Sequence, residues 1–131
     1  MFFHGENSLR EFEDFRPEAH DSDGLLIYHG AGEWLWRPLD NPRALDVRGL
    51  HAMSLRGFGL LQRDRDFGNY QDLESHYEQR PSTWVVPHGD WGSGRVELVQ
   101  IPTKSDTNDN IVAFWRPAVG PRVGEPFHYG Y

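Results

Sequence analysis

Glycine and proline interrupt the apolar segments of this 131-residue chain so often that long helices have little room to form. The sequence holds 14 glycines and 9 prolines. Apolar runs such as 25–28 and 111–115 are correspondingly short. Short runs bounded by glycine and proline are typical of strands and turns. The spacing therefore predicts an all-β domain of short antiparallel strands, an antiparallel β-sandwich.

The turn residues and the alternation of apolar side chains predict individual elements. Gly30 and Gly32 separate 25–28 from 33–37, which predicts a hairpin with Trp34 and Trp36 on one face. Further strands are expected at 43–48, 57–62, 82–86, 95–101, 111–115 and 125–131. The glycines in 57–62 suggest close backbone approach, and 95–101 is expected to contain a β-bulge between Leu98 and Val99. The strand at 111–115 is expected inside a sheet. Tyr70, Leu73 and Tyr77 recur at helical spacing, which predicts one short helix over 70–78.

Composition and charge exclude several classes of function. The net charge is -7, and no basic face suited to a phosphate backbone is visible, so we expect no nucleic-acid partner. The absence of cysteine excludes disulfides, thiolate zinc sites and cysteine nucleophiles. The seven histidines show no paired metal spacing, and we expect no metal and no cofactor. An acidic chain with five tryptophans suits neutral ligands such as sugars, although acidity also simply favours solubility.

Two acidic segments are candidates for catalysis. Asp21 and Asp23 precede the apolar run at 25–28, and Asp106 and Asp109 precede the run at 111–115. Side chains of this kind commonly form turns and cap their own loops. Glycoside hydrolysis, however, requires two carboxyl groups that face each other across the scissile bond. Both interpretations remain open from the residues alone.

Aromatic rings and one charged segment are candidates for sugar contacts. The C–H face of a pyranose packs on an aromatic ring, and Trp91, in a glycine-flanked turn, is expected to be the most exposed tryptophan. Trp115 lies within an apolar run and is expected in the core. Tyr77 can offer a hydroxyl to a ligand. Arg63 opens an alternating segment at 63–66, which predicts a salt-bridged surface strand or the lining of a polar groove.

Several long strings resemble the periplasmic glucans biosynthesis protein G/D family, which acts on osmoregulated periplasmic glucans. They include RPEAHDSDGL at 16–25, GEWLWRPL at 32–39, RGFGLLQRDRDF at 56–67 and TNDNIVAFW at 107–115. The resemblance implies a galactose mutarotase-like β-sandwich and a periplasmic location. Because family members are several times longer, residues 1–131 are expected to be the later part of their large sandwich domain. The signal peptide, the earlier strands and an immunoglobulin-like C-terminal domain are expected to lie outside the chain.

The resemblance also implies a reaction and residue roles. Family members resemble inverting β-1,2-glucan hydrolases, with Asp109 in the position of the general acid and Asp21 in that of the general base. Tyr77 matches a tyrosine on the substrate side, and Asp106 stands where a glutamate is expected. Whether Asp21 or Asp23 faces the substrate stays open at this point.

Two other functions remain as alternatives. The chain can be part of a non-catalytic glucan-binding module that works with glucan synthesis machinery at the inner membrane, or an inactive gene fragment. Unpaired strand edges in a partial sandwich also predict self-association.

Overall fold

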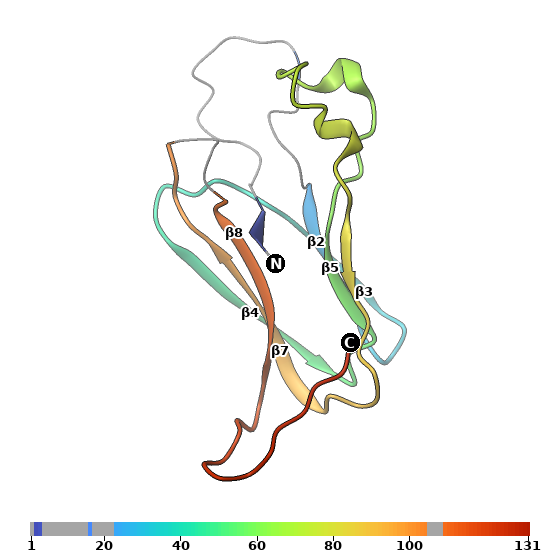
Figure 1. Cartoon of the computed structure of the whole chain (residues 1–131), viewed down its shortest axis with the longest axis vertical. Coiled ribbons are helices and arrows are strands. Elements are labelled where there is room, and N and C mark those ends of the chain that lie inside the picture. Colours follow the sequence, from blue (N-terminus) through green and yellow to red (C-terminus); the bar gives the residue numbers. More distant parts are fainter. Residues whose placement is uncertain (1, 4–15, 17–22, 105–108) are drawn as a thin grey trace.

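Two antiparallel four-stranded sheets make up the part of this protein that the computed structural model describes (Figure 1). The structure describes residues 2–3, 16, 23–104 and 109–131. The strand order is β1-β8-β7-β4 in one sheet and β3-β2-β5-β6 in the other. The predicted all-β sandwich is thereby confirmed. None of the helical segments within the described residues has the length and apolar character of a membrane span.

The strands are numbered in their order along the chain. Their bounds are β1 Phe2–Phe3, β2 Gly24–Tyr28, β3 Trp34–Pro38, β4 Asp46–Met53, β5 Gly57–Leu61, β6 Thr83–Val85, β7 Ser93–Gln100 and β8 Ile111–Pro117. The longest connection, between β5 and β6, contains two short 3-10 helices, η1 Phe67–Asn69 and η2 Tyr77–Gln79.

The hairpin β2–β3 confirms the expected pairing, with Tyr28 opposite Trp34 and Leu26 opposite Trp36. Both tryptophans therefore lie on one face, the outer face of their sheet. Close approach explains the glycines of β5 as predicted. A Cβ atom built on Gly57 would lie 2.5 Å from the Trp84 ring, so the indole of β6 lies directly over the backbone of β5.

The core lies between the two sheets, where alternate residues of β2, β5, β7 and β8 point inward. Its buried members are Leu25, Ile27, Leu39, Ala52, Leu55, Phe58, Leu60, Val96, Leu98, Ile111 and Ala113. Burying one large aliphatic side chain contributes about 1.5–3 kcal/mol. A one-residue slip of any of these strands would turn its buried set to solvent, so the core fixes the register.

The predicted helix over 70–78 is wrong. Tyr70 is fully buried, and the segment that follows it forms turns rather than a helix. The carboxylate of Asp72 accepts hydrogen bonds from the backbone N–H groups of Glu74 and Ser75. His76 has a left-handed backbone with φ of 50°, which no continuous α-helix allows. Local side-chain capping therefore replaces the regular helix that the spacing of apolar residues predicted.

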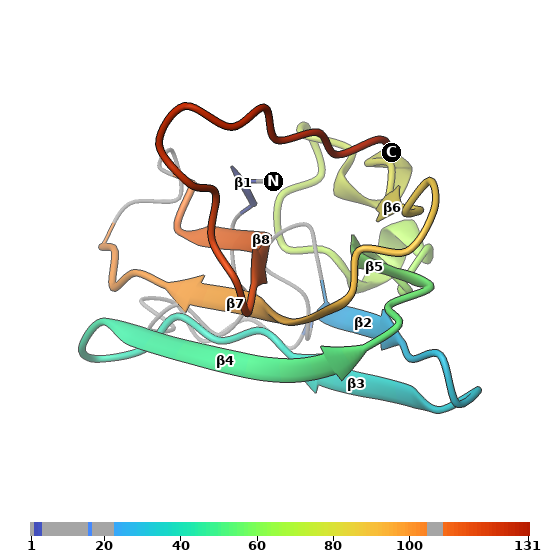
Figure 2. The ribbon, with the colours of Figure 1, turned by 90° about the horizontal axis from the view of Figure 1, so that it is seen from below.

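Two strand predictions also need correction, and a third shifts. The expected β-bulge in β7 is absent, because Asp46–Met53 and Ser93–Gln100 pair without interruption. Leu98 points into the core and Val99 to the outer face. The segment 125–131 is not a strand, although Gly130 forms a single bridge with His88. Figure 2 shows this red C-terminal segment crossing from β8 towards β6. The strand expected at 43–48 begins at Asp46 and continues to Met53.

Candidate functional site

Asp23 fixes the place where β2 begins and the long β5–β6 loop departs. One carboxylate oxygen, Oδ2, accepts hydrogen bonds from the backbone N–H groups of Arg63 (2.5 Å) and Asp64 (3.2 Å). The same oxygen lies 3.5 Å from Nε of Arg63, and the Asp23 side chain is only 11% exposed. Among the described residues, the other oxygen, Oδ1, is buried without a hydrogen-bond partner. Asp23 therefore anchors the start of the β5–β6 loop through one oxygen of a largely buried carboxylate.

Arg63, the partner of Asp23, lies over the outer face of the β3-β2-β5-β6 sheet. Its guanidinium lies 4.2 Å from the centre of the Trp36 ring, in cation–π geometry. The expectation of a salt-bridged strand at 63–66 is wrong, because this segment lies outside the strands. The ion pair of Arg63 is with Asp23 rather than with a neighbour in the segment. Arg63 thus joins the start of β2 to an aromatic surface.

The β5–β6 loop carries Tyr77 on η2. Tyr77 is partly buried, its ring centre lies 6.2 Å from that of Tyr70, and the guanidinium of Arg80 lies 5.6 Å from it. Arg65 holds the end of this turn, because its Nη1 donates to the carbonyl oxygens of Glu78 (2.8 Å) and Arg80 (2.5 Å). These ring contacts and hydrogen bonds within the loop therefore hold Tyr77 in place.

The carboxylate of Glu78 lies beside Tyr77 and is tied to its own loop. Burial would raise the pKa of Glu78. Hydrogen bonds from His76, its own backbone and Gln79, together with attraction to His76, outweigh burial and lower this pKa. The distance between His76 Nδ1 and Glu78 Oε1 is 3.1 Å. Glu78 is therefore held as an anion and is poorly suited to donate a proton.

A short polar connection, residues 39–41, brings the two sheets together at this end of the sandwich. The backbone N–H of Leu39 donates to the carbonyl of Asp23 (3.1 Å). Two residues later, Oδ1 of Asn41 accepts from Nδ2 of Asn110 (3.3 Å). Asn110 is buried and directly follows Asp109. The start of β2 and the start of β8 therefore lie at the same end, although some ninety residues separate them.

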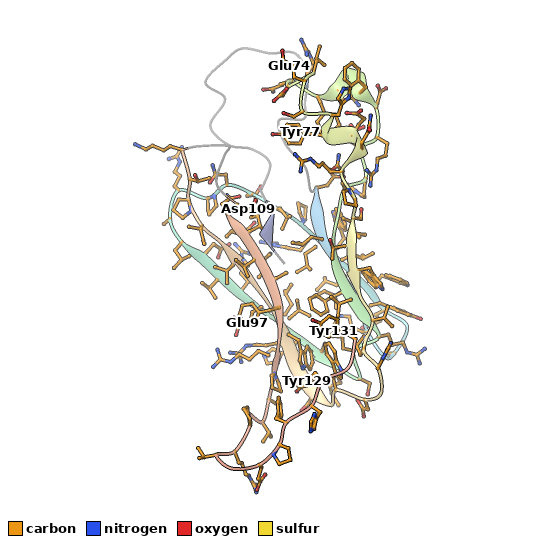
Figure 3. The ribbon with its side chains drawn as sticks, viewed as in Figure 1. Glu74, Tyr77, Glu97, Asp109, Tyr129 and Tyr131 are labelled. Atoms are coloured by element: carbon orange, nitrogen blue, oxygen red, sulfur yellow. The ribbon has the colours of Figure 1, made fainter. Side chains whose placement is uncertain are left out.

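Asp109 itself is exposed and lies two residues before β8. Figure 3 shows Asp109 and Tyr77 towards one end of the molecule, the first just before β8 and the second on the β5–β6 loop. A carboxylate that leads into one sheet and a tyrosine from a loop of the other thus share one end. Asp21 and Asp106, the other two predicted acids, lie outside the described residues.

Trp91 lies at the opposite end of β7. Its Nε1 donates to the carbonyl of Gly130 (3.2 Å), and its ring centre lies 5.0 Å from Tyr129 and 6.0 Å from Trp115. It is partly buried, whereas Trp34 is 59% exposed, so the expectation that Trp91 is the most exposed tryptophan is wrong. The structure brings Asp23, Arg63, Tyr77 and Asp109 to one end and does not bring Trp91 to them.

Sequence reasoning missed the polar residues that organise this end. Asn41 carried only a turn signal, from its Asp-Asn-Pro context. Gln62 follows an apolar strand and gave no signal, because its burial at 5% exposure depends on the folded loop around it. Across the described residues, no three His, Asp or Glu side chains gather in a way that could hold a metal ion.

Comparison with known proteins identifies relatives along the whole chain. The family model described as "Periplasmic glucan biosynthesis protein, MdoG" matches residues 1–131. Proteins named glucans biosynthesis protein G are 56% identical in Pseudomonas entomophila (strain L48), 55% in Pseudomonas aeruginosa (strain LESB58) and 54% in Shewanella baltica (strain OS155). Each match covers all 131 residues of this chain but 23%, 25% and 24% of the relative. The chain therefore spans about a quarter of the length of these relatives.

Proposed function

Because this chain belongs to the periplasmic glucan biosynthesis protein family, we propose that it is part of a periplasmic protein that binds and cleaves a β-1,2-linked glucan. The observation that carries the proposal is the shared end of the sandwich. There the connection 39–41 ties the backbone beside Asp23 to the residue next to Asp109. Carboxyl groups from distant parts of a chain, gathered at one end, are what hydrolysis of a glycosidic bond requires.

In the proposed reaction Asp109 donates its proton to the glycosidic oxygen as the bond between that oxygen and the anomeric carbon breaks. A water molecule attacks the anomeric carbon from the opposite side, and Asp21 takes up the proton that the water loses. The configuration at the anomeric carbon inverts. Desolvation favours the protonated form of a general acid. Asp109 is exposed in the described chain, so in this proposal the bound glucan covers it.

The remaining candidates take binding and positioning roles. One oxygen of Asp23 is committed to the backbone of the β5–β6 loop, which favours Asp21 as the base and Asp23 as a residue that holds the site. Arg63 and Tyr77 are proposed to contact the glucan beside the reacting bond, and Asp106 to support Asp109. Trp91 is left out of this site because it lies at the other end of β7.

The test uses a full-length chimera, in which these 131 residues replace the matching stretch of the Pseudomonas entomophila relative. The chimera is incubated with β-1,2-glucan, and the products are separated by length. We expect progressively shorter glucans. Binding without any shortening would instead support a non-catalytic module that assists synthesis machinery at the inner membrane.

Association of the isolated chain is a separate proposal. β4 is an eight-residue edge strand, and on it Val47 and Met53 are 53% and 77% exposed. An unprotected edge of this length invites pairing with a second chain. We expect the isolated 131 residues to sediment as dimers or larger species, and a monomer at high concentration would contradict this.

A further inference from the structure

Gln62 occupies a position that neither the sequence pattern nor the proposed chemistry assigns. It directly follows β5 and is buried. Its backbone N–H donates to Oγ of Ser82 (3.0 Å), and the same hydroxyl donates to its carbonyl (3.4 Å). Ser82 directly precedes β6. The backbone of Gln62 is therefore fixed where the β5–β6 loop both leaves and rejoins the sheet.

The side-chain amide of Gln62 reaches from this fixed point into the loop. Its Nε2 donates to the hydroxyl of Tyr70 (2.6 Å) and to the backbone carbonyl of Tyr77. The hydroxyl of Tyr70 in turn donates to the carbonyl of Asp64 (3.0 Å), and the Tyr70 ring is fully buried against that of Tyr77. Gln62 thus links the sheet to the backbone of the residue that carries the candidate hydroxyl.

Burial makes this link stiffer than the others in the loop. A hydrogen bond shielded from water is not exchanged for one to solvent, and a buried amide without partners is costly. Arg65 also holds the η2 turn, but its side chain is exposed. Among the described residues, no hydrogen-bond partner reaches the buried amide oxygen of Gln62, Oε1. The contacts made by Nε2, and not by this oxygen, therefore account for a glutamine here.

We propose that Gln62 is a positioning residue that sets the place of Tyr77 against the reacting bond. The inference rests on the proposed function, because it takes Tyr77 to contact the glucan. Displacement of a positioned group by about 1 Å can lower a rate by as much as ~100-fold. Gln62 therefore acts on turnover through Tyr77 and not by touching the substrate.

The kinetic test combines Q62M with Y77F in the full-length chimera. Methionine keeps the length of the side chain and removes both donors. We expect Q62M to lower kcat about tenfold and to leave KM nearly unchanged. In the Y77F background Q62M should have little further effect, because both variants disable the same group. Independent, multiplying effects of the two substitutions would overturn the proposal.

Gln100 provides the matched control. It is also a buried glutamine and is the last residue of β7. Its Oε1 accepts a hydrogen bond from the backbone N–H of Asp40 (2.8 Å). Q100M removes a comparable buried amide without touching the β5–β6 loop. We expect any effect of Q100M on kcat to combine independently with that of Y77F. If the effect of Q100M on kcat also disappeared in the Y77F background, as is expected for Q62M, both substitutions would act by loosening the whole fold. That result would also overturn the proposal.

A second readout does not depend on activity. The N–H groups of Gln79 and Arg80 donate to the carbonyls of His76 and Tyr77 within η2. Hydrogen exchange at these two amides should accelerate in Q62M and stay unchanged in Q100M. If the chimera cleaves no glucan but exchange accelerates, the proposed function fails and the positioning stands. If Q62M does not fold, Y70F removes the hydroxyl that accepts from the amide, together with its bond to the Asp64 carbonyl, and should accelerate the same exchange. Unchanged exchange in the folded variant overturns the proposal.

Discussion

The two ends of the sandwich are formed by the same sheets but carry different kinds of side chain. At one end, Asp23 and Asp109 lie just before β2 and β8, and polar side chains such as Asn41 join the sheets. At the other end, the ring of Trp91 packs against those of Trp115 and Tyr129. Figure 3 shows Tyr129 away from Tyr77, towards this other end. Aromatic side chains dominate the second end, whereas the first end presents carboxylates and hydrogen-bonding groups. We therefore place the proposed chemistry at the first end.

The strongest test of this difference substitutes one aspartate at each end. D23A removes the acceptor of two backbone N–H groups of the β5–β6 loop. We expect a loss of about 1–3 kcal/mol in the free energy of unfolding and at least a ~10-fold fall in glucan turnover. Urea unfolding and a reducing-sugar assay on the full-length chimera measure the two effects.

Asp90 serves as the control at the opposite end, because it also caps a local N–H, that of Gly92 (2.8 Å). D90A should cost about 0.5 kcal/mol and leave turnover unchanged. Equal losses of turnover in the two variants would abolish the distinction between the ends.

Glu97 lies midway along β7 and belongs to neither end. The hydrogen bond from Arg95 (2.8 Å) is the largest effect and lowers the pKa of Glu97, whereas burial raises it. The charge of Arg95 and the contact with Arg116 lower this pKa further. A lowered pKa in the folded state stabilises the protein at pH values above the unfolded pKa. This contribution is lost as the pH falls through the folded pKa.

E97Q should therefore lower the stability at pH 7 by about 1 kcal/mol, and the difference should shrink as the pH falls through the folded pKa of Glu97. Melts of the chimera and its variant over a descending pH series measure this, with turnover unaffected. A difference that persists undiminished at the acid end of the series would show that packing, and not charge, accounts for the effect.

The smallest expected effect is that of W91F. Phenylalanine keeps an aromatic ring beside Tyr129 and loses only the hydrogen bond from Nε1 to the carbonyl of Gly130. We expect about 0.5–1 kcal/mol of lost stability and faster hydrogen exchange at His88, whose N–H donates to Gly130. Glucan turnover should not change. A fall in turnover comparable to that of D23A would place Trp91 in the glucan site.

Local patterns predicted the strands well and the loops poorly. The hairpin β2–β3 followed from Gly30, Gly32 and the alternation of Trp34 and Trp36, because strand period and turn chemistry are local properties. The helix over 70–78 failed because capping by Asp72 and the left-handed backbone of His76 outweighed apolar spacing. Local side-chain hydrogen bonds of this kind compete directly with helix formation.

The candidate site was predictable only in its most distinctive residues. The residues alone made Asp109 and Tyr77 candidates, but their roles came from family resemblance, and no local rule would have joined them. Their common end depends on hydrogen bonds such as that between Asn41 and Asn110, 69 positions apart. Burial of Gln62 likewise depends on a loop that closes over it. Long-range contacts of this kind leave no periodic trace in a sequence.

In the proposed reaction, Asp109 donates the proton that cleaves the glucan at this end of the sandwich. The most direct measurement compares the full-length chimera with its D109N variant for β-1,2-glucan binding and for cleavage. Asparagine keeps the shape and hydrogen-bonding capacity but cannot act as the acid. We predict unchanged affinity with a loss of turnover of about 10²- to 10⁴-fold. Cleavage at the rate of the unsubstituted chimera would contradict the account.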